Sequence, residues 1–160
     1  MSRIEAKLEA MGLTLPEQTV SPGMKLRFKW VRVHGNRAYV SGHGPLNLDG
    51  SVAGPLGKVG QEVTPEQAYQ SARLVALAVL GSLKRELGDL DRVTAWLRVF
   101  GMVNAAPGFN QTPPVINGFS DLIMELYGDE AGTHARSAVG VAALPFNIPV
   151  EIEAEVEIKG

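Results

Sequence analysis

An alternation of apolar and acidic residues near the C-terminal end is the feature that most limits the fold of this chain. Apolar residues occupy every second position from Val150 to Ile158, and four glutamates stand between them. Successive side chains of a strand point to opposite faces of a sheet, so this segment has one apolar face and one face of four carboxylates. It is therefore predicted to be a strand of a sheet that carries helices on one face.

A long helix is the second clear element. Thr64 can cap its start, Pro65 suits the first helical position, and Gln67 completes a capping box. Gly88 stands where a left-handed cap would end the helix. Apolar residues recur between these limits at spacings of three and four, which predicts one buried face. They are Ala68, Ala72, Val75, Val79, Leu83 and Leu87.

Two shorter helices are also predicted. One begins after Thr112-Pro113-Pro114 and ends at Gly128, with start and stop signals at both ends. Its apolar positions are Ile116, Phe119, Ile123 and Leu126. A short amphipathic helix, not a signal sequence, is expected from Met1 to Met11, because two glutamates stand among its apolar residues.

Four further strands are expected before the alternating segment, at residues 26–34, 38–41, 92–103 and 136–142. Gly35-Asn36 supplies a hairpin turn between the first two, and residues 47–58 form a surface loop. The main elements then follow the order β-β-α-β-α-β-β. This order predicts an α+β fold with a single sheet and helices on one face.

Length and charge exclude several classes of protein. The 160 residues suffice for one domain with a sizeable core. There are 15 Lys+Arg and 17 Asp+Glu residues, a net charge of -2, so no nucleic-acid partner is expected. The chain has no cysteine for disulfides, thiolate catalysis or metal binding. No apolar run approaches the roughly 20 residues of a membrane span, so a soluble, cytoplasmic domain without membrane contact is expected.

A family-level motif lies near the C-terminal end. It is ARSAVGVAALP from Ala135 to Pro145, followed by PVEIEA from Pro149 to Ala154. Weaker matches are Gly35-Asn36, Tyr39-Val40-Ser41-Gly42 and Asn117. With these residues the chain resembles the RidA (YjgF-like, reactive intermediate deaminase) family over roughly residues 25–158.

The resemblance implies a chorismate-mutase-like α+β fold and a homotrimer with clefts between subunits. It also implies hydrolysis of short-lived enamine or imine acids, such as 2-aminoacrylate, to a 2-keto acid and ammonia, without a cofactor. The chain is then a single domain, 1–160, with a core at 25–158 and an N-terminal helix and extension at 1–24. This extension makes it similar to a less characterised branch of the family.

The resemblance gives catalytic roles to two residues. In the family, an arginine matching Arg136 binds the substrate carboxylate, and a glutamate matching Glu151 is proposed to position the attacking water. A guanidinium offers two parallel donors to a carboxylate, and a carboxylate can orient water toward an iminium carbon. The structural alternatives are an ion pair for Arg136 and a solvated acidic face for Glu151.

Three more positions match the substrate pocket of the family. Ser41 matches a pocket serine, Gly42 allows the backbone to approach closely, and Asn117 matches a pocket residue at the start of the second main helix. An ordinary strand end and ordinary helix polarity are the structural alternatives. A small carboxylate-bearing molecule is the expected ligand.

The chain departs from the family pattern at aromatic and polar positions. Phe28 stands where many members have tyrosine, and His43 replaces a glutamine. His134 precedes Arg136 by two residues and is expected on the same strand face. Either histidine could donate or accept a proton near pH 7, or be an ordinary surface residue. The histidines lack metal-ligand spacing, so no metal is expected.

The order of the last two strands affects how a site could form. If they pair as a hairpin around residues 144–149, Glu151 lies near Ala142, about 20 Å from Arg136 at about 3.3 Å per residue. This spacing predicts that Arg136 meets its catalytic partners across a subunit boundary. The loop at 104–114, with Phe109, is expected either to cover the cleft or to be an uninvolved surface loop.

Three classes of function fit the sequence. The first is an enamine or imine deaminase, which the Arg136 motif favours. The second is a trimeric carboxylate-binding protein without turnover, which Phe28 in the tyrosine position favours. The third is a ribonuclease, an activity known for some relatives, which the net charge of -2 disfavours.

Overall fold

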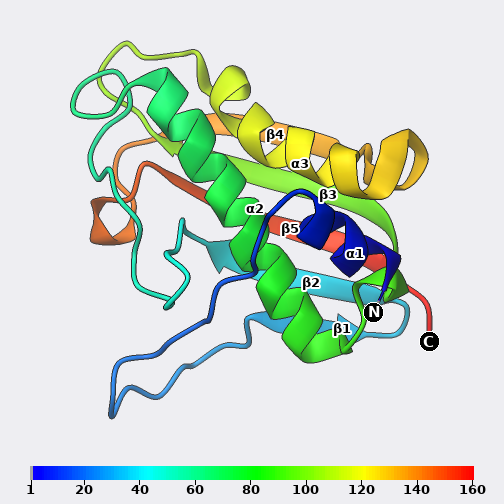
Figure 1. The fold of residues 1–160 in the computed structure, drawn as a ribbon. Coiled ribbons are helices and arrows are strands. Elements are labelled where there is room, and N and C mark those ends of the chain that lie inside the picture. Colours follow the sequence, from blue (N-terminus) through cyan, green and yellow to red (C-terminus); the bar gives the residue numbers. More distant parts are fainter. Residues whose placement is uncertain (1) are drawn as a thin grey trace.

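In the computed structural model, which describes residues 2–160, five strands form one sheet and three α-helices lie against one of its faces (Figure 1). The strands are β1 (Val31–His34), β2 (Arg37–His43), β3 (Val93–Asn104), β4 (Ala135–Val141) and β5 (Val150–Ile158). The helices are α1 (Arg3–Ala10), α2 (Pro65–Leu87) and α3 (Thr112–Gly132), with short 3-10 turns at Leu90–Arg92 and Pro145–Asn147. The α+β class and the predicted order of the main elements are confirmed.

The last strand lies in the middle of the sheet, whose order is β1-β2-β5-β3-β4. β5 runs antiparallel to both β2 and β3, whereas β4 runs parallel to β3 at the edge. The hairpin of the last two strands, which the estimate of about 20 Å assumed, does not form. A helical crossover from β3 makes β4 a parallel neighbour, which leaves the other side of β3 for β5.

The alternation in β5 decides which face of the sheet the helices cover. Its apolar side chains are at most 8% exposed and join the core beneath the helices. Burial of each larger side chain contributes roughly 1.5–3 kcal/mol. The four glutamates point to the opposite face, which no helix of residues 2–160 covers (Figure 1).

The two long helices begin close to where the sequence predicts. Thr64 and Gln67 form the expected capping box, and Gly88 ends α2 at a φ of 81°. In α3, which begins at Thr112, the backbone leaves helical geometry at Gly128 before one further turn. Gly128 is thus a break in the helix and not its end. None of the helices within residues 2–160 has the length and apolar character of a membrane span.

The first two strands differ in length from the prediction. β1 begins at Val31 and not at residue 26, and the residues before it have no regular structure. β2 continues past Ser41 to His43, because a bulge lets two of its residues oppose one residue of β5. Gly35, with a φ of 62°, lies in the turn between the strands.

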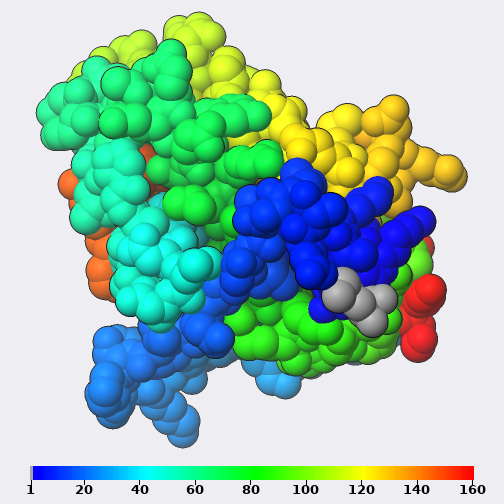
Figure 2. All heavy atoms as spheres, viewed as in Figure 1, coloured from blue at the N-terminus to red at the C-terminus, as the bar shows by residue number. Residues whose placement is uncertain are grey.

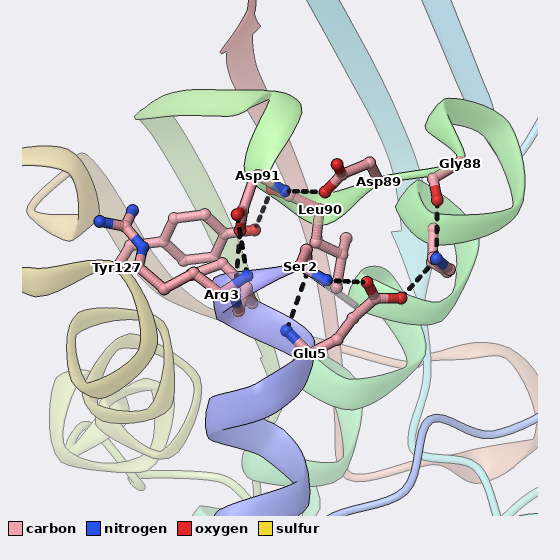
Figure 3. Close-up of polar contacts among 10 residues, drawn as sticks. Ser2, Arg3, Glu5, Gly88, Asp89, Leu90, Asp91 and Tyr127 are labelled. Atoms are coloured by element: carbon pink, nitrogen blue, oxygen red, sulfur yellow. Dashed lines mark hydrogen bonds and ion pairs between the residues drawn. The ribbon is translucent and has the colours of Figure 1, made fainter.

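The N-terminal helix α1 is hydrogen-bonded to the segment that leads into β3 (Figure 3). Ser2 and Glu5 form a capping box, and the Asp91 carboxylate accepts the first two backbone N–H groups of the helix at 2.8 and 3.0 Å. Glu5 also pairs with Lys84 of α2. Ile4 is fully buried, so α1 belongs to the core of the domain.

The helices α2 and α3 approach each other closely at Gly118. A Cβ atom at Gly118 would lie 2.0 Å from the Tyr69 carbonyl oxygen and 3.1 Å from the Ala72 Cβ. The Tyr69 hydroxyl donates to Asp121 at 2.6 Å beside this contact. Because residue 118 has no side chain, the helices can come this close, and the contact fixes the neighbouring Asn117.

Gly118→Ala is expected to destabilise the protein by at least about 2 kcal/mol, because the added methyl group would overlap a backbone carbonyl. In an exposed helix the same change would stabilise by about 1 kcal/mol through helix propensity. Denaturant unfolding followed by circular dichroism measures the difference. An unchanged or higher stability would contradict the close contact between α2 and α3.

Candidate functional site

The eight residues predicted for the site lie in two separate places. One set borders a cavity at the ends of β2 and β5, and we call it the pocket group; it comprises Phe28, Ser41, Gly42, His43 and Glu151. The other set lies between α3 and β4, and we call it the arginine group; it comprises Asn117, His134 and Arg136.

The cavity beside the pocket group has a volume of about 870 Å³. Its walls come from residues 18–30, 41–52 and 145–151, which are distant in sequence. Figure 2 shows the first of these segments as the blue projection at lower left, next to the cyan loop after β2. Within residues 2–160, no group of three or more His, Cys, Asp or Glu side chains could hold a metal ion.

The bulge in β2 brings the backbone of the pocket group against a carboxylate. The register of β2 on β5 shifts between Val40 and His43, where Ser41 and Gly42 form the bulge. A Cβ atom at Gly42 would lie 2.5 Å from Oε2 of Glu151 and 3.0 Å from its Cδ. Only glycine at this position leaves the Glu151 carboxylate where it is.

Glu151 differs from the other glutamates of β5. It is half-buried, and burial raises the pKa of its carboxyl group, with a further increase from the charge of Glu153. Glu155 instead pairs with Arg37 at 2.5 Å, and Glu157 accepts a hydroxyl hydrogen bond at 2.8 Å. A carboxylate with a raised pKa is a stronger proton acceptor than a solvated one, so Glu151 is the glutamate best suited to acid–base chemistry.

His43 belongs to the core, because only 2% of its surface is exposed. Its Nδ1 lies 2.5 Å from the Ser41 carbonyl oxygen and is therefore assigned the hydrogen, while Nε2 accepts the Ser82 hydroxyl at 2.8 Å. Arg85 donates to Ser82 in turn, at 3.2 Å. Burial lowers the pKa of His43 to about 4, so the ring is neutral near pH 7. Both ring nitrogens are engaged within the protein, which argues against proton exchange with a ligand.

Trp30, which the sequence pattern did not single out, lies between two members of the pocket group. Its ring centroid is 5.0 Å from that of Phe28, edge to face, and 4.9 Å from that of His43. Phe28 is 51% exposed where it borders the cavity. The spacing of two residues between Phe28 and Trp30 is the sequence signal that could have indicated Trp30.

Arg136 is held by neutral groups of α3. Its Nη1 donates to Oδ1 of Asn117 at 2.8 Å and to Oγ of Ser120 at 3.0 Å. The ion pairs within residues 2–160 do not include it; they are Arg37–Glu155, Arg73–Glu125 and Lys84–Glu5. The structural alternative, an arginine paired with a nearby acid, is therefore not observed among the described residues. Arg136 is half-buried, and its charge has no carboxylate partner among the described residues.

His134 and Ser120 extend the arginine group. The Ser120 Oγ lies 2.9 Å from Nε2 of His134, whose Nδ1 lies 2.8 Å from the Gly132 carbonyl oxygen. The carbonyl can only accept, so Nδ1 carries the hydrogen, and Nε2 accepts from the Ser120 hydroxyl. Burial lowers the pKa of His134, and the charge of Arg136 adds to the effect. Ser120 follows Asn117 by three residues on one helix face, a spacing that could have indicated it.

Arg136 and Glu151 lie on opposite faces of the sheet. Val99 of β3 pairs with Arg136, and Met102 pairs with Glu151, three residues further along. Arg136 and Glu151 are thus offset by three residues along the strands, at about 3.3 Å per residue, and by two strand spacings across the sheet, at about 4.8 Å each. Their Cα atoms are therefore about 14 Å apart, whereas a hairpin would place them about 20 Å apart. Arg136 points to α3 and Glu151 to the uncovered face. One chain alone does not bring these side chains together.

Of the two alternatives for the loop after β3, a cover over the cleft or an uninvolved surface loop, the structure shows no cover over this cavity. Phe109 packs onto the core beside Gly60 and is absent from the cavity wall.

Asn104, at the end of β3, has a role that the sequence did not indicate. Only 1% exposed, it donates from Nδ2 to Asn147 and to the Ile148 carbonyl, each at 3.2 Å. This amide therefore fixes the turn that forms one wall of the cavity.

The buried state of His43 predicts how stability depends on pH. The unfolded chain takes up a proton near pH 6.5, but the folded chain does so only near pH 4. The free energy of unfolding is therefore expected to fall as the pH drops through this window, by on the order of 3 kcal/mol in total from His43, with His134 acting in the same direction.

Denaturant titrations at several pH values measure this slope. His43→Gln is expected to flatten it, whereas His34→Gln, at an exposed position in β1, is the matched control and leaves it unchanged. Equal slopes in the original protein and in His43→Gln would contradict the buried neutral imidazole.

Comparison with known proteins identifies relatives along nearly the whole chain. Residues 5–154 match the model of a family described as "YjgF/chorismate mutase-like, putative endoribonuclease". Protein TCP17 of Trypanosoma cruzi is 38% identical over 156 residues, which are 98% of this chain and 94% of that protein.

Solved structures agree with this assignment. The Agrobacterium tumefaciens protein Atu1372, described as having unknown function, is 39% identical with a TM-score of 0.87, covering 98% of this chain and 93% of its own. A protein from Shewanella oneidensis is 28% identical with a TM-score of 0.87, covering 97% and 99%. The YjgF gene product of E. coli, 20% identical, shares the fold with a TM-score of 0.59 over 91% and 98%. The chain therefore belongs to the YjgF/chorismate-mutase-like family.

Proposed function

We propose that the protein hydrolyses reactive enamine and imine acids to 2-keto acids and ammonia, at sites formed between its subunits. Arg136 holds the substrate carboxylate, and Glu151 of another subunit orients the attacking water. Ser41 and Gly42 line the reacting end of the pocket. No cofactor is required, because the C=N bond of the substrate is already activated toward water.

The observation that carries this proposal is the unpaired charge of Arg136. Asn117 and Ser120 occupy only Nη1 of its guanidinium. Its Nε and Nη2 hydrogens have no protein acceptor within residues 2–160, and together they form the edge that grips a carboxylate through two parallel hydrogen bonds. A half-buried cation of this kind favours an anionic ligand, because leaving a buried charge unpaired is unfavourable.

The reaction requires the protein to position the substrate and the water and to supply one proton acceptor. Water forms a bond to C2 of the iminium while its proton passes to the Glu151 carboxylate. That proton then moves to nitrogen, the C2–N bond breaks, and ammonia leaves as the new hydroxyl loses its proton to give the keto acid. An enamine first takes up a proton at its terminal carbon. The raised pKa of Glu151 suits the exchange.

The remaining predicted residues have supporting roles in this proposal. Asn117 positions Arg136 directly, and His134 does so through Ser120. His43 ties the bulge to α2 through its bonds to Ser41 and Ser82. Phe28 forms part of the apolar wall.

Subunit association completes the site. Because Arg136 and Glu151 lie on opposite faces of one sheet, a ligand that touches both must lie between chains. A homotrimer closed by one repeated interface gives three equivalent sites of this kind. The uncovered face of the sheet, with its row of glutamates, is available for such contacts (Figure 1).

A binding protein without turnover is the second candidate. Glu151 and His43 are the titratable side chains that border the cavity, and His43 is neutral with both nitrogens engaged. Phe28 supplies no hydroxyl. If Glu151 does not activate water, the same Arg136 would retain a carboxylate ligand unchanged. A ribonuclease is disfavoured, because neither the cavity nor the net charge of -2 attracts a polyanion.

Arg136→Ala is expected to lower kcat/KM for 2-aminoacrylate by roughly 100-fold or more, because two charge-assisted hydrogen bonds to the substrate carboxylate are lost. Arg136→Lys should recover only part of the activity, since an ammonium group cannot reproduce the planar pair of donors. Ammonia and keto-acid release above the buffer rate measures both.

Arg73→Ala, which removes an ion pair on the outer side of α2 and α3, is the matched control and should retain full activity. Full activity in Arg136→Ala would refute the proposal. Binding of a stable carboxylate by the original protein without any release of ammonia would favour the second candidate.

Mixing of two inactive variants tests whether the site lies between subunits. Arg136→Ala and Glu151→Ala are each expected to be nearly inactive alone. In trimers reassembled from an equal mixture, about a quarter of the interfaces combine an intact Glu151 with an intact Arg136, so about a quarter of the activity should return. Continued inactivity of well-formed mixed trimers would show that both residues act from the same chain.

A further inference from the structure

The cavity is much larger than a three-carbon acid requires. Such an acid fills roughly the space of three or four waters, on the order of 100 Å³ at about 30 Å³ per water. The cavity measures about 870 Å³, within the range of pockets that enclose whole drug-sized ligands. Half of this volume would still hold a molecule several times larger than 2-aminoacrylate.

The cavity also has two chemically distinct ends. The bulge and Glu151 supply the polar end, where the reaction is proposed to occur. Away from it, large apolar side chains remain exposed toward the cavity: Met24 is 58% exposed, Phe28 51% and Phe146 76%. Exposed apolar groups gathered in one concave site indicate an apolar ligand, since soluble proteins otherwise bury such groups.

Part of the apolar wall comes from the N-terminal extension, which is bonded to the loop after β2 at its start. The amide of Glu17 donates to the Leu48 carbonyl at 2.9 Å, and the Thr19 hydroxyl donates to the Gly50 carbonyl at 3.3 Å. A Cβ atom at Gly50 would lie 2.9 Å from the Glu17 carbonyl oxygen, so the two backbones meet closely. These contacts hold Glu17 and Thr19 against the loop after β2, and the chain continues from there along the cavity wall.

Phe146 completes the wall from the opposite side in an unusual backbone conformation. Phe146 and Asn147 have φ values of 58° and 57°, a left-handed region that non-glycine residues rarely adopt. Asn104 holds this turn through Asn147 and the Ile148 carbonyl, and the Gly57 amide donates to the Asn147 carbonyl at 2.8 Å. A strained turn that keeps a phenyl ring exposed at a cavity is typical of a ligand contact.

We infer that the substrates are 2-imino or 2-enamine acids with an aromatic or similarly large apolar side chain. This inference rests on the proposed function and specifies its substrate class. The carboxylate binds Arg136 of a neighbouring subunit, the C=N carbon lies at Glu151, and the side chain of the substrate packs among Met24, Phe28 and Phe146. An aryl group suits this wall because its faces and edges pack well against aromatic rings and a thioether.

The test compares imino acids that differ only in the side chain. They are generated from alanine, leucine and phenylalanine with an amino-acid oxidase, and keto-acid release is measured above the spontaneous rate. We expect kcat/KM for the phenylalanine-derived imine to exceed that of the alanine-derived imine by at least about tenfold, because its side chain leaves water.

Two variants test whether the apolar wall of the cavity causes the preference for the phenylalanine-derived imine. Phe146→Ala and Met24→Ala are expected to reduce the ratio of the two kcat/KM values several-fold. Leu56→Ala, which removes an exposed leucine outside the cavity wall, is the matched control and should leave the ratio unchanged. Thermal unfolding and particle size are measured for each variant. If the wall variants lower both rates equally, or dissociate the oligomer, the apolar wall contacts protein and the inference is wrong.

The remaining outcomes separate the inference from the proposed function. If the alanine-derived imine is hydrolysed as efficiently as the larger ones, the inference is wrong and the deaminase proposal stands. If no imine is hydrolysed faster than in buffer, the deaminase proposal and the substrate class both fail, and calorimetry with 3-phenylpropanoate and propanoate then decides whether the wall binds an apolar group. Tighter binding of the aryl acid, lost in Phe146→Ala, would support the apolar site, and equal or absent binding would overturn it.

Discussion

The pairing of β5 with both β2 and β3 is the constraint on which the rest of the structure depends. It places the alternating strand at the centre, so its apolar face becomes the floor of the core and its glutamates share one open face. Pairing with β2 sets Glu151 over Gly42 in the bulge. Pairing with β3 leaves β4 at the edge, where Arg136 forms a hydrogen bond with Asn117 of α3. The two candidate catalytic side chains are thereby separated within one chain.

Two hydrogen-bond chains of the same design fix the two halves of the candidate site. In each, an arginine donates to a serine, the serine donates to Nε2 of a histidine, and Nδ1 donates to the carbonyl two residues earlier. Such a chain leaves no free hydrogen-bonding capacity on the histidine ring, so the ring serves as a rigid connector. One chain ties the bulge to α2 and the other ties Arg136 to α3; they are Arg85–Ser82–His43–Ser41 and Arg136–Ser120–His134–Gly132.

The accuracy of the sequence-based predictions follows from the range of the interactions involved. The capping box at Thr64, the stop at Gly88 and the full extent of β5 were predicted correctly, because propensity and alternation act over a few residues. The hairpin assumed for the last two strands does not form, because a strand pattern shows which face is buried but not which neighbour it pairs with. His43 was expected to contact the substrate, and only its burial beneath α2 showed that both of its ring nitrogens are bonded within the protein.

The sequence by itself determined the α+β class, the single covered face of the sheet and the family, since periodicity and a contiguous motif are local properties of the chain. It also identified Arg136 and Glu151 as the candidate catalytic residues. Only the tertiary structure decided that these charges face opposite sides of the sheet, that Arg136 has no acidic partner within residues 2–160, and that the N-terminal extension forms a cavity wall. Each of these features depends on which distant segments meet, and that is set by the packing of the whole core.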